Sequence, residues 1–278
     1  MVHMIPIADP LDSRIDGFRN LNHAEKRRDH AGPDGVIIGE GSLVIDRMLA
    51  SWCPPTQFLG TEAGIARLTA MPDYGALAAS TPFFLATEEV ISECVGFHFN
   101  RHIFALAPRP TPRTVEDVLA YSPRTLAVLE GLNDHANIGS IFRNAAALGV
   151  GGVLIGAGCA DPLYRRSVRV SMGHVLRIPF APCTGGPNDW QEPTFAQLRA
   201  AGYRILALTP AHDAQVLSDV AEGGKVAFIV GAEGPGLCRK TMRLADARVQ
   251  IPMQIGVDSL NVATSAAVAF YERVRTQH

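Results

Sequence analysis

Six continuous apolar runs in the second half of the chain constrain its fold more than any other feature. They are TLAVLEGL, GGVLIG, VLRIPFA, RILALTP, KVAFIVG and ARVQIPM. Apolar residues follow one another in these runs instead of alternating with polar ones, which is typical of strands buried on both faces of a parallel sheet. Helix-like segments lie between the runs. The pattern predicts an α/β domain with a mainly parallel, doubly wound sheet.

A proline-rich segment separates this half from the first part of the chain. Residues 105–124 hold four prolines, and proline lacks a backbone donor and disfavours helix in the residue before it. We therefore expect a first domain of residues 1–110, a linker of residues 111–123 and a second domain of residues 124–278. The first domain mixes strand-like and helix-like stretches, which predicts a small α/β/α unit.

Composition and charge narrow the classes of function. The chain has 278 residues, of which 47% are hydrophobic and 19% charged, so it can bury a full core. No apolar run approaches the ~20 residues needed to span a bilayer, and the start lacks the pattern of a secretory leader. Five scattered cysteines without a CxxC pair are expected to be reduced thiols. We expect a cytoplasmic protein without a metal site or a membrane partner.

The net charge of −2 argues against strong non-specific binding of polyanions. The net charge does not exclude RNA as a partner, because the chain has two local basic clusters. They lie in residues 23–30 (HAEKRRDH) and 163–170 (LYRRSVRV). A solvated helix face is the alternative explanation of each cluster, and it is the favoured explanation of the first taken alone.

Three polar, glycine-containing segments follow apolar runs, where ligands bind in open α/β sheets. The first, residues 133–150, carries an apolar stripe at helical spacing. Asn137 is expected at the helix N-cap, and Arg143 lies on the opposite side of the helix. Spacing alone leaves two interpretations of Arg143 open. It is either an ordinary surface arginine or a guanidinium directed at a phosphate.

The second segment, GAEGPGL, follows the run KVAFIV. Its glycines permit positive φ angles and a close approach of the backbone to a ligand, but their spacing is not that of a dinucleotide-binding GxGxxG motif. Glu233 lies among them. It is either a solvated carboxylate in a turn or a carboxylate held at a site or subunit interface.

The third segment, residues 251–272, begins at the end of a predicted strand. Ser259 is expected to be the N-cap of the following helix, with Leu260 and Asn261 in its first turn. Backbone donors in a first turn are free to bind a ligand. Simple capping explains Ser259 and Asn261 equally well. The helix that follows carries a stripe of small residues, which allows close packing.

Taken together and in this order, the three segments resemble the motifs of the SpoU family, the TrmH-like RNA ribose 2′-O-methyltransferases. The Arg169-Val-Ser-Met-Gly run resembles a further family segment whose arginine contacts RNA. The resemblance covers about residues 126–275. The matching positions are Asn137, Gly139 and Arg143; Gly231, Glu233, Gly236 and Leu237; and residues 251–253 and 259–262.

The resemblance implies a fold that periodicity does not show. The second domain would be an α/β SPOUT methyltransferase domain with a deep trefoil knot at its C-terminus, and the first would resemble ribosomal-protein-like RNA-binding domains. The family is expected to form a homodimer and to bind S-adenosyl-L-methionine. The implied reaction is methyl transfer to a ribose 2′-hydroxyl of tRNA or rRNA. The alternative is a non-catalytic RNA-binding protein that keeps the fold.

Roles for individual residues also follow from the resemblance. Arg143 would bind a phosphate and help to deprotonate the 2′-oxygen, with the phosphate taking part because an arginine is a poor base. Ser259 and Asn261 would position the ribose or phosphate, Glu233 and Asn137 would organise the site, and Arg169 would contact RNA. The implied cofactor-binding residues are Leu208, Thr209, Gly231, Ile251, Met253 and Leu260.

Overall fold

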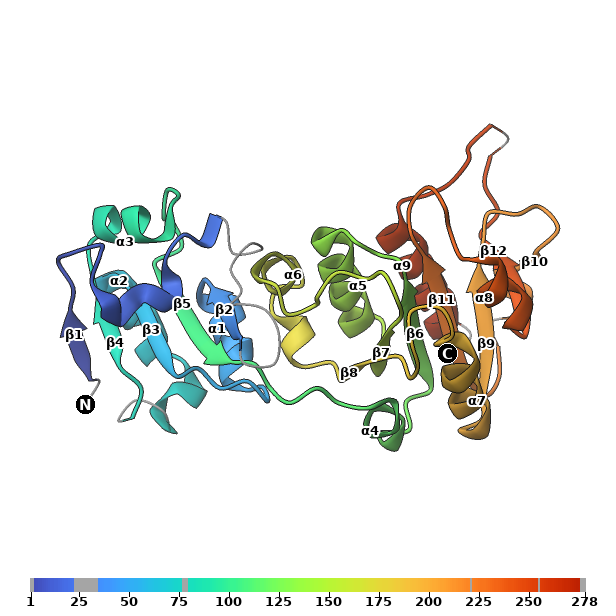
Figure 1. Cartoon of the computed structure of the whole chain (residues 1–278), viewed down its shortest axis with the longest axis horizontal. Coiled ribbons are helices and arrows are strands. Elements are labelled where there is room, and N and C mark those ends of the chain that lie inside the picture. Colours follow the sequence, from blue (N-terminus) through green and yellow to red (C-terminus); the bar gives the residue numbers. More distant parts are fainter. Residues whose placement is uncertain (1–2, 23–34, 77–79, 221, 255, 276–278) are drawn as a thin grey trace. The chain divides into compact units, whose positions relative to one another are not determined.

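The computed structural model describes residues 3–22, 35–76, 80–220, 222–254 and 256–275 (Figure 1). The basic cluster at residues 23–30 lies outside these ranges. The chain forms two compact units. Unit 1 comprises Met1–Thr111 and Pro162–Arg177, and unit 2 comprises Pro112–Asp161 and Ile178–His278. The segment 162–177, which the predicted second domain includes, thus groups with the first part of the chain. The predicted linker contains helix α4 (Val115–Ala120), which begins at a capping box made by Thr114 and Asp117.

Unit 1 is built on a five-stranded mixed sheet in the order β1-β4-β3-β5-β2. β3 pairs in parallel with β4 and antiparallel with β5, and β5 pairs antiparallel with β2. Helix α3 packs on one face, and α1 lies against the other, where Ile45 and Met48 approach Gly39 of β2. The strands are β1 (Met4–Pro6), β2 (Val36–Glu40), β3 (Gln57–Gly60), β4 (Phe83–Leu85) and β5 (Ile103–Pro108), and the helices are α1 (Ser42–Leu49), α2 (Glu62–Thr69), α3 (Glu88–Val95) and α6 (Arg165–Val170).

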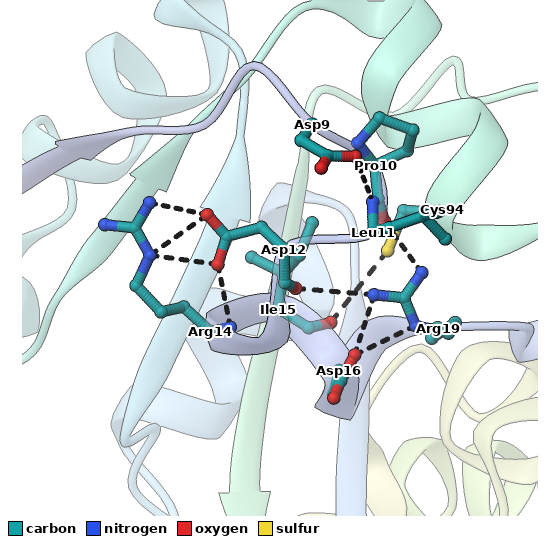
Figure 2. A network of polar contacts seen from close by, with 9 residues as sticks. All are labelled: Asp9, Pro10, Leu11, Asp12, Arg14, Ile15, Asp16, Arg19 and Cys94. Atoms are coloured by element: carbon teal, nitrogen blue, oxygen red, sulfur yellow. Dashed lines mark hydrogen bonds and ion pairs between the residues drawn. The ribbon is translucent and has the colours of Figure 1, made fainter.

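A short 3-10 helix, Ser13–Phe18, closes one side of the unit 1 core through Ile15 and Phe18. Figure 2 shows the polar contacts that hold it. Asp12 accepts a hydrogen bond from the backbone N–H of Arg14 at 2.9 Å, and the Arg14 guanidinium pairs with the same carboxylate. The hydrogen bond from the Arg14 side chain lowers the pKa of Asp12 to about 2, so this carboxylate is charged throughout the physiological range.

Unit 2 is built on a seven-stranded sheet in the order β10-β12-β9-β11-β6-β7-β8. Every pair of neighbouring strands is parallel, which confirms the prediction from the apolar runs. The strands are β6 (Thr125–Glu130), β7 (Gly152–Ile155), β8 (Phe180–Pro182), β9 (Tyr203–Leu208), β10 (Gln215–Val216), β11 (Lys225–Gly231) and β12 (Ala247–Gln250). The run VLRIPFA is strand only at its end, because His174–Leu176 forms a 3-10 turn. The two-residue edge strand β10 was not predicted.

Helices cover both faces of this sheet. On one face, α4 and α7 (Gln191–Ala200) place Val118, Trp190 and Phe195 in a core cluster with strand residues. On the other, α5 (His135–Ala147) and α9 (Val262–Arg275) pack their rings on the strands. Phe142 meets Phe180 edge-on at 5.5 Å between ring centroids, and Phe270 lies 6.3 Å from Phe228. Helix α8 (Arg239–Leu244), which the sequence did not predict, packs beside α7.

The strand order of unit 2 reverses direction at its centre. The chain runs outward through β6, β7 and β8, returns to form β9 on the other side, and then inserts β11 between β6 and β9 (Figure 1). Such a reversal leaves a crevice beyond the carboxyl ends of the strands, where ligands bind in open α/β sheets. The carboxyl ends of β9, β11 and β12 are therefore the place to look for a site.

The cysteines of unit 2 provide a test of its packing. Burial raises the pKa of Cys159 to about 11 and that of Cys183 to about 12, whereas Cys238 is exposed. At pH 8 the thiolate fraction of Cys159 and Cys183 is then more than about a hundredfold below that of an ordinary exposed thiol. We expect iodoacetamide to alkylate Cys238 first in the native chain, as followed by peptide mass mapping. Equal rates at Cys159 and Cys238 would contradict this packing.

Candidate functional site

A cavity of about 340 Å³ lies at the carboxyl ends of β9, β11 and β12. Three loops form its walls: the first residues after β9, the glycine-rich turn after β11, and the segment between β12 and α9. All six residues that the resemblance implied for cofactor binding line it, as do Glu233 and Ser259. The lining residues are Leu208, Thr209, Pro210, Val230, Gly231, Ala232, Glu233, Gly234, Gly236, Val249, Ile251, Met253, Asp258, Ser259, Leu260, Val262 and Ser265.

Backbone and amide hydrogen bonds fix the loops beside β9 and β12. The N–H of Thr209 donates to the carbonyl of Val249 at 2.9 Å, which extends the pairing of β9 and β12 into the cavity wall. The Gln250 side-chain amide donates to the carbonyls of Ala214 at 2.7 Å and His212 at 3.1 Å. The cavity is therefore a preformed feature of the strand ends, as small-molecule sites usually are.

The turn after β11 requires glycine for a reason that the sequence did not reveal. Gly234 and Gly236 have φ angles of +86° and +67°, in the left-handed region. At Gly231, a Cβ atom would lie 2.5 Å from the backbone nitrogen of Leu237 and 2.6 Å from the carbonyl carbon of Gly236. The missing side chain thus lets the turn fold back onto its own strand, whereas the sequence suggested close approach to a ligand.

Glu130, at the end of β6, anchors the far side of this turn and was missed by sequence reasoning. The residue is only 8% exposed. It accepts hydrogen bonds from the backbone N–H of Cys238 at 2.8 Å and from the hydroxyl of Thr241. A buried carboxylate needs such partners. The signal in the sequence was one glutamate that ends the otherwise apolar run TLAVLE.

Side chains from all three motif segments meet at the mouth of the cavity. The Asn261 side-chain amide donates to Glu233 Oε1 at 2.7 Å and to Asn137 Oδ1 at 2.9 Å. The Asn137 amide donates to the same Glu233 oxygen at 3.2 Å. Asn137 and Asn261 lie outside the cavity lining, so their contacts orient Glu233, which does line it. We call Asn137, Glu233 and Asn261 the amide–carboxylate triad.

Two predicted helix caps are wrong. Asp134, not Asn137, caps α5 and accepts from the N–H of Ala136 at 2.8 Å, so Asn137 lies inside the helix. Asn261, not Ser259, caps α9, since its Oδ1 accepts from the N–H groups of Ala263 at 3.0 Å and Thr264 at 3.2 Å. Both segments hold several residues able to cap, and sequence alone does not choose among them. The side chain of Ser259 is thereby left beside the cavity.

Converting Asn261 to aspartate is expected to make stability fall as pH rises. Asn261→Asp keeps the cap acceptor but faces the Glu233 carboxylate with a second one, which raises the pKa of the pair in the folded state. Stability is then kept below about pH 4 and lost above it. Because both side chains are exposed, we expect a loss of only about 1 kcal/mol at pH 7, or about 2–4 °C in unfolding temperature. Asn188→Asp, on an exposed loop, is the matched control. An unfolding temperature that does not fall with rising pH would contradict the triad.

The remaining candidates lie apart from the cavity lining. Arg143 is exposed on α5, and the adjacent Asn144 ties that helix to α9 by donating to the carbonyl of Ala263 at 2.9 Å. Arg169 belongs to unit 1, where its guanidinium lies 3.7 Å from the Glu40 carboxylate. The structure thus brings Glu233, Ser259, Asn137 and Asn261 together in unit 2 and leaves Arg143 out of the cavity.

Two properties of the residues that the structure describes bear on the class of site. Within those residues, no group of three or more His, Cys, Asp or Glu side chains is placed to hold a metal ion. Over the same ranges, no helix combines the length and apolar character needed to cross a bilayer.

Comparison with known proteins adds to this geometry. The model of the SpoU rRNA Methylase family matches residues 124–271. An uncharacterized tRNA/rRNA methyltransferase from Mycobacterium bovis is 46% identical over 275 residues, which cover 98% of this chain and 92% of the relative. Among solved structures, an RNA 2′-O ribose methyltransferase has a TM-score of 0.74 at 25% identity, covering 98% of this chain and 99% of that one. An AdoMet-bound rRNA methyltransferase from Sinorhizobium meliloti has a TM-score of 0.74 at 22% identity, covering 98% of each chain.

Proposed function

This chain belongs to the SpoU rRNA methylase family, and we propose that it transfers a methyl group from S-adenosyl-L-methionine to a ribose 2′-hydroxyl of tRNA or rRNA. The observation that carries the proposal is the meeting of three separate motif segments at one cavity. Two structural relatives support it, since one is an RNA 2′-O ribose methyltransferase and another was crystallised with AdoMet.

The cavity suits the methyl donor in size and in the chemistry of its walls. Its volume of about 340 Å³ falls within the range of small-molecule sites. Leu208, Ile251 and Leu260 offer apolar surface for an adenine, and the glycine-rich turn offers backbone groups at close range. When bound, the donor supplies an activated methyl group on a sulfonium. The chain then has to align an oxygen with that methyl group, which is largely a matter of positioning.

The proposed division of labour follows the geometry. Asn137 and Asn261 hold Glu233 in a fixed orientation at the mouth of the cavity. Ser259, beside the cavity, would hydrogen-bond the ribose or its phosphate. Arg143 would bind the adjacent phosphate with its planar fork and favour the ionised 2′-oxygen. Because an arginine stays protonated, a phosphate oxygen would take the proton.

A homodimer gives Arg143 access to a reaction site. Arg143 does not line the cavity of its own chain and is exposed on α5. A second copy of the chain would carry the arginine to its partner's cavity, so the active site would be completed across the interface. We also propose that the cavity loops form the trefoil knot of the family, that residues 1–110 form the RNA substrate-binding domain, and that Arg169 contacts RNA. A cytoplasmic location stays a prediction.

Methyl transfer from a labelled donor to bulk tRNA and bulk rRNA tests the proposal. Alkaline hydrolysis locates the label, because a 2′-O-methyl group removes the nucleophile that cleaves the neighbouring phosphodiester. We expect label in alkali-resistant dinucleotides. Label on free nucleotides would show base methylation and overturn the ribose assignment. RNA binding without any transfer would favour the alternative, a non-catalytic RNA-binding protein.

A further inference from the structure

A second cavity, of about 270 Å³, lies within unit 1, and it shares no lining residue with the cavity of unit 2. It is formed by the end of β2, the start of α1, the segment before β5 and part of the chain around α6. Its polar lining includes Arg67, Arg101, Arg169, His102, Ser42 and Glu40. We call it the arginine pocket. Three arginines face one carboxylate, so its lining carries a net positive charge.

Glu40 organises the arginine side chains around this pocket. The residue is only 4% exposed. Arg165 donates to it at 2.6 Å and is itself largely buried, stacked 4.8 Å from the centre of the Phe97 ring. One buried arginine therefore balances the one buried carboxylate. Arg101 and Arg169 also approach Glu40. Their positive charges are not neutralised by any other carboxylate among the lining residues.

Glu40 engages those two arginines only in part, and both remain partly exposed. Arg101 contacts Glu40 through Nε at 3.1 Å, which leaves the terminal nitrogens of its fork without this partner. Arg169 Nη1 lies 3.7 Å from the carboxylate, too far for a hydrogen bond. Their side chains are 50% and 36% exposed, respectively. Arg67, on α2, is exposed as well. A ligand entering the pocket would meet guanidinium donors from three separate elements.

The start of helix α1 adds uncharged donors to the same pocket. Its N-cap is Gly41, with φ at +84° and no side chain to accept from the first N–H groups. Ser42, Leu43 and Val44, the first residues of the helix, line the pocket. The Ser42 hydroxyl oxygen is buried without a hydrogen-bond partner among the described residues. A buried hydroxyl is rarely left unpaired, so the Ser42 hydroxyl is available to a polar ligand in the pocket.

We propose that the arginine pocket binds a phosphate group of an RNA backbone. Guanidinium forks and a helix N-terminus are the groups that bind phosphate oxygens best. The described lining holds no Phe, Tyr or Trp on which a base would stack, and the exposed arginines suit a phosphate carried on a longer strand. The inference rests on the proposed function for its choice of RNA, and it assigns a phosphate contact to residues of unit 1 that do not line the cavity of unit 2.

The test compares binding of a mixed-sequence single-stranded RNA by the full chain over a range of salt concentrations. The variant is Arg67→Gln with Arg101→Gln, neither of which has a role in the methyl-transfer site. Losing one phosphate contact lowers the slope of log K against log salt by about 0.7, which is about fivefold in affinity at about 0.1 M salt. The control is Arg14→Gln, an exposed arginine of unit 1 outside the pocket, for which we expect an unchanged slope.

Each outcome bears on the pocket separately from methyl transfer, because RNA binding is measured without the methyl donor. Equal losses in the variant and the Arg14→Gln control would show a diffuse charge effect and overturn the proposal. Inorganic phosphate is the second probe, followed by arginine side-chain NMR signals. If it shifts the signals of Arg67 and Arg101 while the variant binds RNA normally, the pocket takes free phosphate and the RNA assignment is wrong. Variant stability is checked by thermal unfolding, and Arg67→Gln alone serves if the double variant is unstable.

Discussion

Replacing Arg143 by alanine is expected to lower the kcat of methyl transfer about 10²- to 10³-fold, the usual effect of removing one group that stabilises developing charge. Arg143 is exposed and lies outside the cavity lining, so the affinity for the methyl donor is expected to stay unchanged. Calorimetric titration of S-adenosyl-L-methionine and single-turnover transfer to RNA measure the two effects separately.

Two further variants sharpen this prediction. Arg143→Lys keeps the charge but loses the planar fork, and we expect it to restore only part of the rate. Arg243→Ala removes another exposed arginine, on α8, and is expected to transfer methyl groups normally. Full activity in Arg143→Ala would show that the arginine has no role in transfer. Mixed dimers of Arg143→Ala and a cavity-defective chain should recover activity if the arginine acts across the interface.

Substituting Gly231 by alanine is expected to weaken binding of the methyl donor. The new Cβ would lie 2.5 Å from the backbone nitrogen of Leu237, and backbone cannot move aside as a flexible side chain can. Overpacking of this kind costs about 1–3 kcal/mol. If the turn moves to relieve it, the cavity wall moves too, and we expect donor affinity to fall about tenfold or more.

Gly75→Ala is the matched control for this substitution. A Cβ atom at Gly75 meets nothing within 4 Å, so the same added methyl group should leave donor binding intact. Thermal unfolding of both variants separates a local change from a general loss of folding. If Gly231→Ala binds the donor as tightly as the unaltered chain, the turn is more adaptable than its backbone contacts indicate, and the glycine has no special role.

Much of unit 2 could be predicted because a strand buried on both faces needs apolar residues at nearly every position. Strands such as β6 and β11 have sheet on both sides and helices above and below, so nearly every position must be apolar. The apolar stripe of α5 can be recognised in the sequence for the same reason, since Ile138, Ile141 and Phe142 are all fully buried. The location of the cavity followed in turn, because the polar segments come directly after those strands.

What escaped prediction depends on contacts between distant residues. Asn261 uses its oxygen to cap α9 and its nitrogen to hold Glu233 and Asn137, and nothing in the local sequence distinguishes this from a cap at Ser259. Glu130 looked like the polar end of a strand, yet it holds a turn that follows another strand. The order of strands is equally hidden, because an apolar run does not reveal its neighbours.

The late insertion of β11 has a consequence for how the protein is made. Both neighbours of β11 precede it in the chain, β6 from residue 125 and β9 from residue 203. Until residues 225–231 have left the ribosome, β6 and β9 each lack the strand that pairs with both of them in the finished sheet. Their unpaired backbone groups then favour aggregation. Nascent chains halted before β11 should therefore be retained by chaperones, and chains extended past α9 should be released.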